Sequence, residues 1–277
     1  MGNTGQGAGN GRNSSGGPGR VPPPPAAKTP TSNTSVATAA EQALFANAMT
    51  LRNPPGGPTS RNASPDVAVL QRQMGQTGDE AGMVGVPPHQ KLYVGTSKSY
   101  NINQYLNTNG TSIKARGSQW DQLGYNKTMI KNDIAKIDRG MKGLSNDVKL
   151  TRFVYGDQLG QMLGNKGINN GTIDTLITSL KRGDATAVSN FRSALKGADY
   201  THKAYTSATY VSNHPAFDMR DVRLNFVARK GTKAVVTNNH AEHEILLGRN
   251  IKYNFTGDFR VVTTPKGVDQ LVIDVYS

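Results

Sequence analysis

Apolar residues recur every three or four positions in three segments of the middle of the chain. This spacing places them on one face of a helix. It predicts a helix over residues 126–144, ended by Gly143 and the polar cluster at 145–147. Two shorter helices follow, separated by Asp184 as an N-cap and ended by Gly197. Their apolar stripes are Ile173, Leu176, Ile177 and Leu180 in one, and Val188, Phe191 and Leu195 in the other.

After Gly197 the period shortens, and apolar residues occur in the short or alternating runs that are typical of strands. We expect strands at 205–210, 222–229, 233–236, 244–247, 253–255, 259–262 and 271–276, with turns at Lys230-Gly231 and Pro265-Lys266-Gly267. One earlier segment, 148–155, also alternates. Helices followed by strands predict an α+β fold with a largely antiparallel sheet.

Arg152 falls on the apolar phase of the strand at 148–155. A guanidinium cannot shed its charge by losing a proton, so in that position it needs an anionic partner. A carboxylate of the core and a bound phosphate both meet this need.

The N-terminal third has a different composition. Residues 1–36 are mainly Gly, Asn, Ser and Pro, which cannot bury enough surface to fold. We expect residues 1–90 to be a disordered leader with short helices near 38–51 and 65–74. Thr38 and Glu41 are spaced as a capping box, and Ser64-Pro65 could begin the second helix. These helices could dock a carrier or form only transiently, and the folded domain would span 91–277.

Composition narrows the choice of function. The chain has no cysteine, which excludes disulfides and thiolate zinc sites. It has no apolar run long enough for a membrane span and no apolar segment of the kind found in secretory signals. The net charge of +13 suits nucleic acid, an anionic membrane, or an acidic or phosphate-bearing ligand. Most of this charge lies within 91–277, scattered singly and without interleaved aromatic residues, which does not favour nucleic-acid binding.

Glu242 and Glu244 directly precede the apolar run 245–247. Residues two apart on a strand face the same way, so the two carboxylates would lie side by side and oppose each other's ionisation. A substrate carbon that becomes positively charged, such as a glycosyl carbon losing its leaving group, would stabilise such a pair. The same pattern also occurs on ordinary solvated strands.

Three segments, taken together and in order, resemble the Arg-Ser-Glu class of mono-ADP-ribosyltransferases. This class includes the enzymatic components of clostridial binary toxins and transferases carried in some phage virions. The segments are 150–156 with Arg152, 199–209 with Ser207, and 242–253 with Glu242 and Glu244. The chain departs from the usual pattern at Phe153, where Gly is frequent, and at Ala208 and Thr209. The likeness covers about residues 98–277, and it implies an ADP-ribosyltransferase-like fold with a β-sandwich core.

The resemblance also implies roles for single residues. NAD is the expected substrate, and no metal is expected. Glu244 would be the catalytic glutamate, Ser207 would position it, and Glu242 would direct transfer to an arginine of a target protein. Arg152 is expected to bind the pyrophosphate of NAD, and the backbone of Phe153 is expected to bind the nicotinamide. An aromatic ring from Phe217, or alternatively Tyr210, would lie over the nicotinamide. Tyr205, beside Ser207, is also expected to contact NAD.

Three other functions compete with this one. The run His240-Ala-Glu242-His243-Glu244 could bind a metal, but a strand would turn His243 away, and the His-Glu-x-x-His motif is absent. An enzyme with the same fold could hydrolyse NAD without transferring ADP-ribose to a protein. Alternatively, the chain could be a basic nucleic-acid-binding or structural protein. We expect a toxin or phage-type effector that acts in the cytoplasm of a target cell after delivery, with a carrier or virion component binding the leader.

Overall fold

A computed structural model of the chain describes residues 37–52, 67–75, 98–113, 125–237 and 242–276. All of them belong to one folded unit, Thr34–Ser277. Residues 1–36 of the expected leader lie outside the described residues, as do Ser64, Pro65 and His240.

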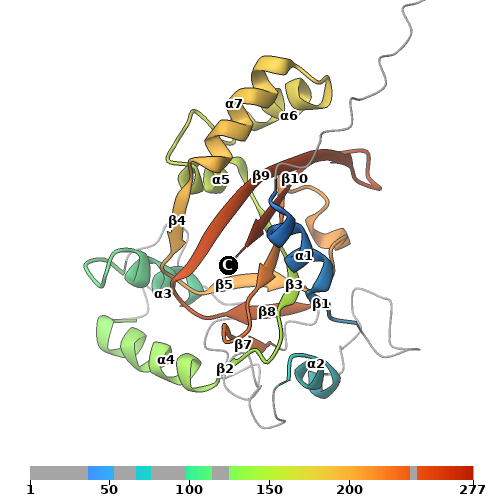
Figure 1. Ribbon diagram of the computed structural model, residues 1–277. Coiled ribbons are helices and arrows are strands. Elements are labelled where there is room, and N and C mark those ends of the chain that lie inside the picture. The colour runs from blue at the N-terminus through green and yellow to red at the C-terminus, as the bar shows by residue number, and fades with distance from the viewer. Residues whose placement is uncertain (1–36, 53–66, 76–97, 114–124, 238–241, 277) are drawn as a thin grey trace, which may run out of the picture. The chain divides into compact units, whose positions relative to one another are not determined.

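A ten-stranded sheet forms the centre of the fold (Figure 1). Its strand order is β2-β7-β8-β5-β3-β6-β10-β9-β4, and β1 pairs with β3 outside this path. The β1–β3 and β6–β10 pairs are parallel and the other pairs are antiparallel. The strands are β1 (Met49–Thr50), β2 (Lys142–Gly143), β3 (Val148–Val154), β4 (Asp199–His202), β5 (Thr206–Thr209), β6 (Val222–Ala228), β7 (Lys233–Val236), β8 (Glu244–Leu247), β9 (Ile251–Thr263) and β10 (Asp269–Tyr276).

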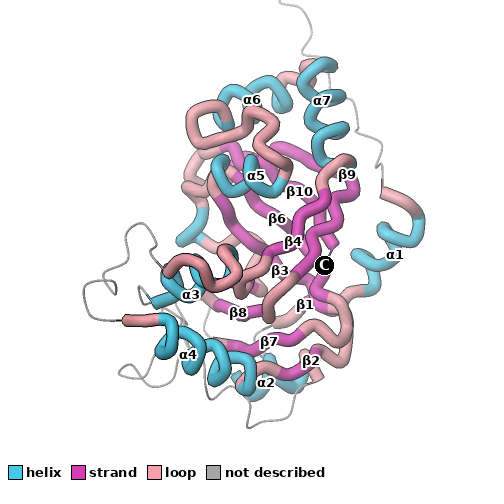
Figure 2. Tube along the Cα trace, turned by 90° about the vertical axis from the view of Figure 1, so that its left-hand side faces the viewer, coloured by secondary structure: helices cyan, strands magenta, loops and turns pink. Residues whose placement is uncertain are grey.

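Helices cover the sheet in three groups (Figures 1 and 2). Helices α5 to α7 pack on β3, β6, β9 and β10 in the main hydrophobic cluster, which also contains Leu70 and Met74 of the α2 segment. Helices α3 and α4 pack on Tyr205, β7 and β8 in a second cluster. Helix α1 packs on β6 and β10. The helices are α1 (Ala39–Asn47), α2 (Val67–Gln73), α3 (Lys98–Asn107), α4 (Lys127–Arg139), α5 (Gly156–Met162), α6 (Ile173–Lys181), α7 (Ala185–Lys196) and the 3-10 turn η3 (Pro215–Phe217).

The predicted α+β fold with a largely antiparallel sheet is confirmed. Two of the predicted caps are present as well. The Asp184 side chain accepts a hydrogen bond from the Ala187 N–H at the start of α7, and Thr38 forms a capping box with Glu41 at the start of α1. These ends form where expected because a cap involves only residues three or four apart.

The helix predicted over 126–144 ends earlier than expected. Asn126 is its N-cap, but Gly140 is the C-cap, and Lys142–Gly143 form the short strand β2 beside β7. Met141 and Leu144 are still buried, though outside the helix. Their apolar spacing continued the helical pattern although the chain had already changed direction.

Two further expectations need correction. The strands expected at 253–255 and 259–262 are one strand, β9, whose pairing with β10 continues past a register shift. Gly257 lies at this irregularity with a φ of +89°, a conformation that glycine adopts readily at a bulge. Strand β4 and helices α3 and α5 were not expected.

The short helices near residues 38–51 and 65–74 are not isolated pieces of a linker. Leu70 and Met74 of the α2 segment are 0% exposed and belong to the main core, and β1 pairs with β3. In α1, Phe45 packs edge-on against Tyr276 of β10, with ring centroids 4.9 Å apart. The packed unit therefore includes residues well before position 91.

Candidate active site

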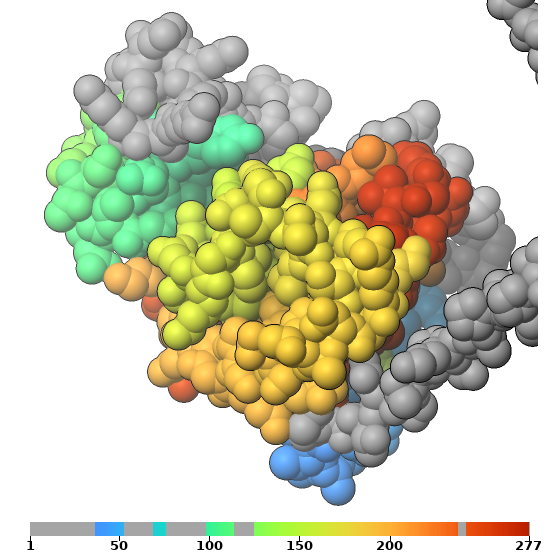
Figure 3. All heavy atoms as spheres, turned by 90° about the horizontal axis from the view of Figure 1, so that it is seen from above, coloured from blue at the N-terminus to red at the C-terminus, as the bar shows by residue number. Residues whose placement is uncertain are grey.

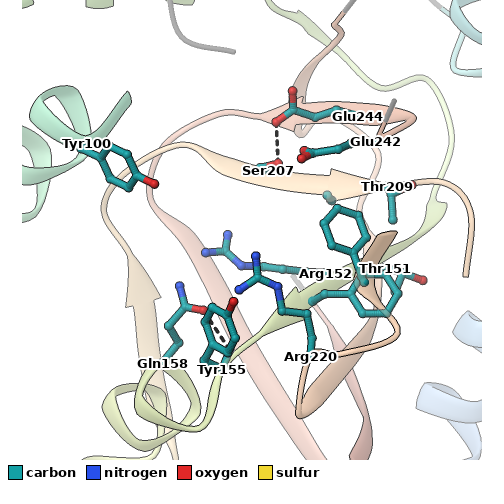
Figure 4. A pocket seen from close by; sticks show the side chains of 13 residues that line it. Tyr100, Thr151, Arg152, Tyr155, Gln158, Ser207, Thr209, Arg220, Glu242 and Glu244 are labelled. Carbon is teal, nitrogen blue, oxygen red and sulfur yellow. Dashed lines mark hydrogen bonds between the residues drawn. The ribbon is translucent and has the colours of Figure 1, made fainter. Parts of the chain in front are cut away.

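A cleft of about 470 Å³ opens where β3, β5 and the start of β8 meet α3, α5 and the η3 turn (Figure 4). Figure 3 shows the α3 segment (green) and the α5–α7 segment (yellow) on the same face of the molecule. The residues that line the cleft are Tyr100, Thr151, Arg152, Phe153, Tyr155, Gln158, Ser207, Ala208, Thr209, Phe217, Arg220, Glu242 and Glu244.

Glu244 is the first residue of β8 and is only 5% exposed. The Ser207 hydroxyl on β5 donates a hydrogen bond of 2.5 Å to its Oε1 atom. The Thr237 hydroxyl donates one of 2.9 Å to its Oε2 atom. Strand β8 lies between β5 and β7, so Glu244 receives one hydroxyl from each neighbouring side. Both carboxylate oxygens of Glu244 are therefore fixed by hydrogen bonds from hydroxyl groups of the protein.

Glu242 lines the cleft beside Glu244 but does not lie on a strand. Glu242 and His243 form the turn that leads into β8, and His243 has a φ of +49°. The prediction that Glu242 and Glu244 both lie on one face of a strand is therefore wrong, because only Glu244 is part of the strand. Both carboxylates still reach the same cleft, because the left-handed turn sends the buried His243 side chain away from them.

Behind the turn, His243 binds His214. The two imidazoles approach to 3.0 Å between His243 Nδ1 and His214 Nε2. His214 Nδ1 accepts a hydrogen bond of 3.2 Å from the Ala216 N–H. A neutral His214 therefore carries its proton on Nε2 and donates it to His243. This pair connects the glutamate turn to the η3 turn, which contains Phe217.

Two guanidinium groups lie next to each other in the cleft (Figure 4). Arg152 projects from β3, and its Nη1 atom is buried without a hydrogen-bond partner among the described residues. Arg220 lies over the ring of Tyr155, 3.8 Å from the ring centroid. Neither arginine forms an ion pair of 4.0 Å or less within the described part of the chain. A negatively charged ligand could therefore supply the anion that the Arg152 guanidinium needs.

His202 is a buried histidine whose pKa is affected by the charge of Arg152. Burial, together with the positive charge of Arg152, lowers the pKa of His202 to about 3. His202 is therefore neutral near pH 7, and its Nδ1 atom lies 2.9 Å from the Thr206 hydroxyl.

Phe153 and Phe217 form an aromatic wall of the cleft. Their rings stack with centroids 4.9 Å apart and come from β3 and the η3 turn. Phe153 occupies a position where glycine is frequent in the class that the sequence resembles, and its ring stacks on Phe217 and lines the cleft. Of the two aromatic residues considered for the nicotinamide, Phe217 lines the cleft, whereas Tyr210 lines a different cavity.

Tyr205, like Tyr210, is a predicted site residue that does not line the cleft. It is 1% exposed, and its hydroxyl donates to Asp138 Oδ1 at 2.6 Å and lies 3.2 Å from the Ile134 carbonyl of α4. Its neighbourhood is the cluster between α4 and the sheet. Tyr205 directly precedes the strand that carries Ser207, but its hydroxyl binds α4 and does not reach the cleft.

The residues of the site that were not expected from the sequence include Tyr100, Gln158, Arg220 and Thr237. Arg220 had a usable signal in the sequence, whereas the position of Thr237 follows from strand register. Arg220 follows Phe217 by three residues and donates its N–H to the Phe217 carbonyl at 3.0 Å, so one turn brings both to the cleft. Thr237 directly follows β7, and pairing of Val236 with Ile245 places it opposite Glu244.

No group of three or more His, Cys, Asp or Glu side chains that could hold a metal ion occurs among the described residues. The helices that the structure describes are all too short or too polar to cross a lipid bilayer.

A family model described as ADP-ribosyltransferase exoenzyme matches residues 90–276. No curated protein sequence matches the chain. Similar solved structures include Plx2a, an ADP-ribosyltransferase toxin from Paenibacillus larvae, with 20% identity over 64% of this chain and 79% of that one, and a TM-score of 0.45. The C3 exoenzyme of Clostridium limosum has 21% identity over 67% and 82%, also with a TM-score of 0.45. An ADP-ribosyltransferase from Clostridium botulinum has 18% identity over 83% and 98%, with a TM-score of 0.47.

Proposed function

Because the chain belongs to the ADP-ribosyltransferase exoenzyme family, whose members use NAD, we propose that it transfers ADP-ribose from NAD to an arginine side chain of a target protein. One observation carries the proposal. A buried glutamate, Glu244, is held by two hydroxyls in a cleft that also contains Glu242 and two guanidinium groups.

The cleft suits NAD as the donor. The buried Nη1 atom of Arg152, which has no partner among the described residues, and the neighbouring guanidinium of Arg220 would bind the pyrophosphate, since forked donors match phosphate oxygens. The stacked rings of Phe153 and Phe217 offer a flat apolar surface for the nicotinamide. Tyr100 and Gln158 line the remaining wall.

Glu244 would stabilise the transition state. As the bond between the nicotinamide nitrogen and the ribose C1′ breaks, nicotinamide leaves with the electron pair, and positive charge develops on the ribose. A carboxylate fixed in advance stabilises that charge without reorganising, and one of its oxygens can accept a hydrogen bond from the ribose 2′-hydroxyl. Ser207 and Thr237 supply the fixation, so they act through Glu244.

Glu242 would select the acceptor. It lies in the turn at the cleft, where an incoming arginine side chain can reach it. Its carboxylate can pair with the guanidinium and take one of its protons as the arginine nitrogen attacks C1′. A neutral amide at this position could do neither.

We propose further that the enzyme is a toxin or phage-type effector that acts on a target-cell protein after delivery. Residues 1–90 would include the segment that binds a carrier or virion component. The positive charge of the chain would favour encounter with an acidic target surface.

The test incubates the full chain with NAD labelled in the adenylate part and a lysate of candidate target cells. Protein-bound label and free nicotinamide are measured together. We expect label with an arginine-type chemical stability, lost in Glu244→Gln and strongly reduced in Glu242→Gln, while nicotinamide release by Glu242→Gln persists. The matched control is Glu41→Gln, which changes a glutamate on α1 that does not line the cleft.

Two results would contradict the proposal. Nicotinamide release by the unchanged chain without protein label, across several lysates and with added arginine compounds, would indicate a hydrolase of NAD. Label that is equal in the unchanged chain and in Glu242→Gln would exclude arginine as the acceptor selected by Glu242.

A further inference from the structure

A second cavity, of about 650 Å³, lies between helix α1 and the sheet. In Figures 1 and 2, α1 lies against the sheet near β10. Phe45 of α1 contacts Tyr276, and the Ala37 N–H at the start of this segment donates to Asp258 Oδ2 at 3.0 Å. Of the residues that line the catalytic cleft, only Thr151 also lines this cavity. The two are therefore separate spaces.

Strand register explains why the wall of this cavity is polar. Thr151 pairs with Asn225, and Asn225 pairs with Asp274, so three polar residues form one row across β3, β6 and β10. In a nearby row, Arg223 pairs with Val272, which pairs with Arg260. Side chains opposite one another on paired strands share a face, so both arginines point to the same side of the sheet as Asp274.

Three cations, Lys149, Arg223 and Arg260, and two carboxylates, Asp258 and Asp274, line this cavity, so positive charge is in excess. Arg260 pairs with Asp274 at 3.3 Å, and Asp274 also accepts from Asn225 at 3.0 Å. Arg223 has neutral acceptors within the described part of the chain: its Nη1 atom donates to the Ser212 carbonyl at 3.0 Å and to Asn213 Oδ1 at 2.6 Å. Its Nε atom is buried and has no hydrogen-bond partner among the described residues.

Arg223 therefore keeps a charge that its surroundings do not favour. Burial, with the positive charge of Arg260, lowers the pKa of Arg223. A guanidinium nevertheless stays protonated near neutral pH, so an anion bound beside Arg223 would offset the cost of its partial burial. A third cation, Lys149, also lines the cavity and lies opposite Val227 on β6, which pairs with Tyr276.

The aromatic side chains indicate what else a ligand would contact. The rings of Phe45, Tyr210 and Tyr276 line the cavity beside the polar rows. A site with convergent polar groups and an apolar wall, of this volume, is typical of small-molecule binding. The Arg223 end would receive a charged head group, and the Tyr276 end would receive an apolar body.

We propose that this cavity binds a phosphate ester with a planar apolar body, its phosphate on Arg223 and Arg260. The Nη1 atoms of Arg223 and Arg260 already donate to Ser212, Asn213 and Asp274. A phosphate is favoured over a carboxylate because it has more oxygens to accept from the remaining donors of two guanidinium groups. The proposal goes beyond the transferase reaction and does not depend on it.

The test measures binding of naphthyl phosphate to the full chain by fluorescence anisotropy, with inorganic phosphate and naphthol as comparison ligands. We expect naphthyl phosphate to bind more tightly than either. Arg223→Gln should weaken it about tenfold or more, since hydrogen bonds to charged groups are the strong ones. Arg223→Lys should give an intermediate loss, because it keeps the charge and removes the fork. Circular dichroism and thermal unfolding establish that each variant is folded.

Arg152→Gln is the matched control, because it removes the corresponding arginine of the catalytic cleft and should leave this binding unchanged. Binding lost in Arg152→Gln but kept in Arg223→Gln would place the ligand in the catalytic cleft and overturn the proposal. Equal affinity in the unchanged chain and the folded Arg223→Lys variant would exclude forked recognition. Inorganic phosphate binding as tightly as naphthyl phosphate would exclude a site for an apolar body.

Discussion

His214 and His243 share one hydrogen bond of 3.0 Å, which joins the η3 turn to the turn that carries Glu242. Both imidazoles are buried, and the ring of Tyr210 packs edge-on against His243 at 5.4 Å. The turn that contains Phe217 and the turn that contains Glu242 are thus joined to each other through one pair of side chains. Motion of either turn alone would break this bond.

His243→Asn should therefore slow catalysis without abolishing the fold. Asparagine tolerates the left-handed backbone at this position but is too short to preserve the imidazole pair. We expect kcat to fall about tenfold, a typical loss when catalytic groups are held less well, with a smaller change in KM for NAD. Steady-state kinetics of nicotinamide release measure both. His202→Gln, at a buried histidine that does not line the cleft, is the control, and equal kcat values in all three proteins would contradict the role of the pair.

Thr237→Val should reduce kcat while Thr237→Ser should nearly restore it. Valine has the shape of threonine but leaves Glu244 Oε2 without its 2.9 Å donor. An unsatisfied buried acceptor costs about 1–3 kcal/mol, so we expect a loss of roughly tenfold or more in rate or a matching loss of stability. Kinetics and thermal unfolding of both variants separate these effects. Full activity in a stable Thr237→Val protein would show that Ser207 alone positions Glu244.

Arg152→Lys and Arg220→Lys should each raise KM for NAD more than they lower kcat. Lysine keeps the positive charge but cannot offer two parallel donors, and it cannot stack on Tyr155 as Arg220 does. We expect an increase in KM of about tenfold for each, in keeping with the strength of charge-assisted hydrogen bonds. Arg182→Lys, at the exposed C-cap of α6, should leave KM unchanged. Unaltered KM in both cleft variants would remove the arginines from NAD binding.

Stability should fall as the pH falls from about 6.5 towards 3, partly through His202. The pKa of His202 is lowered from its ordinary 6.5 to about 3 by burial and by Arg152. Between these values the unfolded chain binds a proton that the folded chain does not, so acid favours unfolding. One such group contributes a slope of about 1.4 kcal/mol per pH unit.

His202→Gln removes this titration, so its unfolding free energy should depend less steeply on pH within that window. Urea unfolding at several pH values measures the slope in both proteins. Parallel curves for the two would show that His202 titrates normally in the folded chain.

Much of this protein was determined by its sequence alone. The helical and alternating periods predicted an α+β order with a largely antiparallel sheet, and they gave β7 and β8 with their observed ends. Arg152, Ser207 and Glu244 were predicted as site residues, and all three line one cleft. The strands and caps are predictable because periodicity and capping depend on residues close together in the chain, whereas Ser207 and the role of Glu244 were predicted through the family resemblance.

Only the tertiary structure decided what depends on strand register and on contacts between distant segments. Thr237 reaches Glu244 because β7 and β8 pair with Val236 opposite Ile245, and Tyr205 is removed from the cleft because Asp138 of α4 binds its hydroxyl. The packing of α1 on Tyr276 and the unbalanced charge at Arg223 likewise join segments far apart in the chain. A local pattern cannot contain these facts, because the register of a sheet is fixed by the whole set of side chains that it buries.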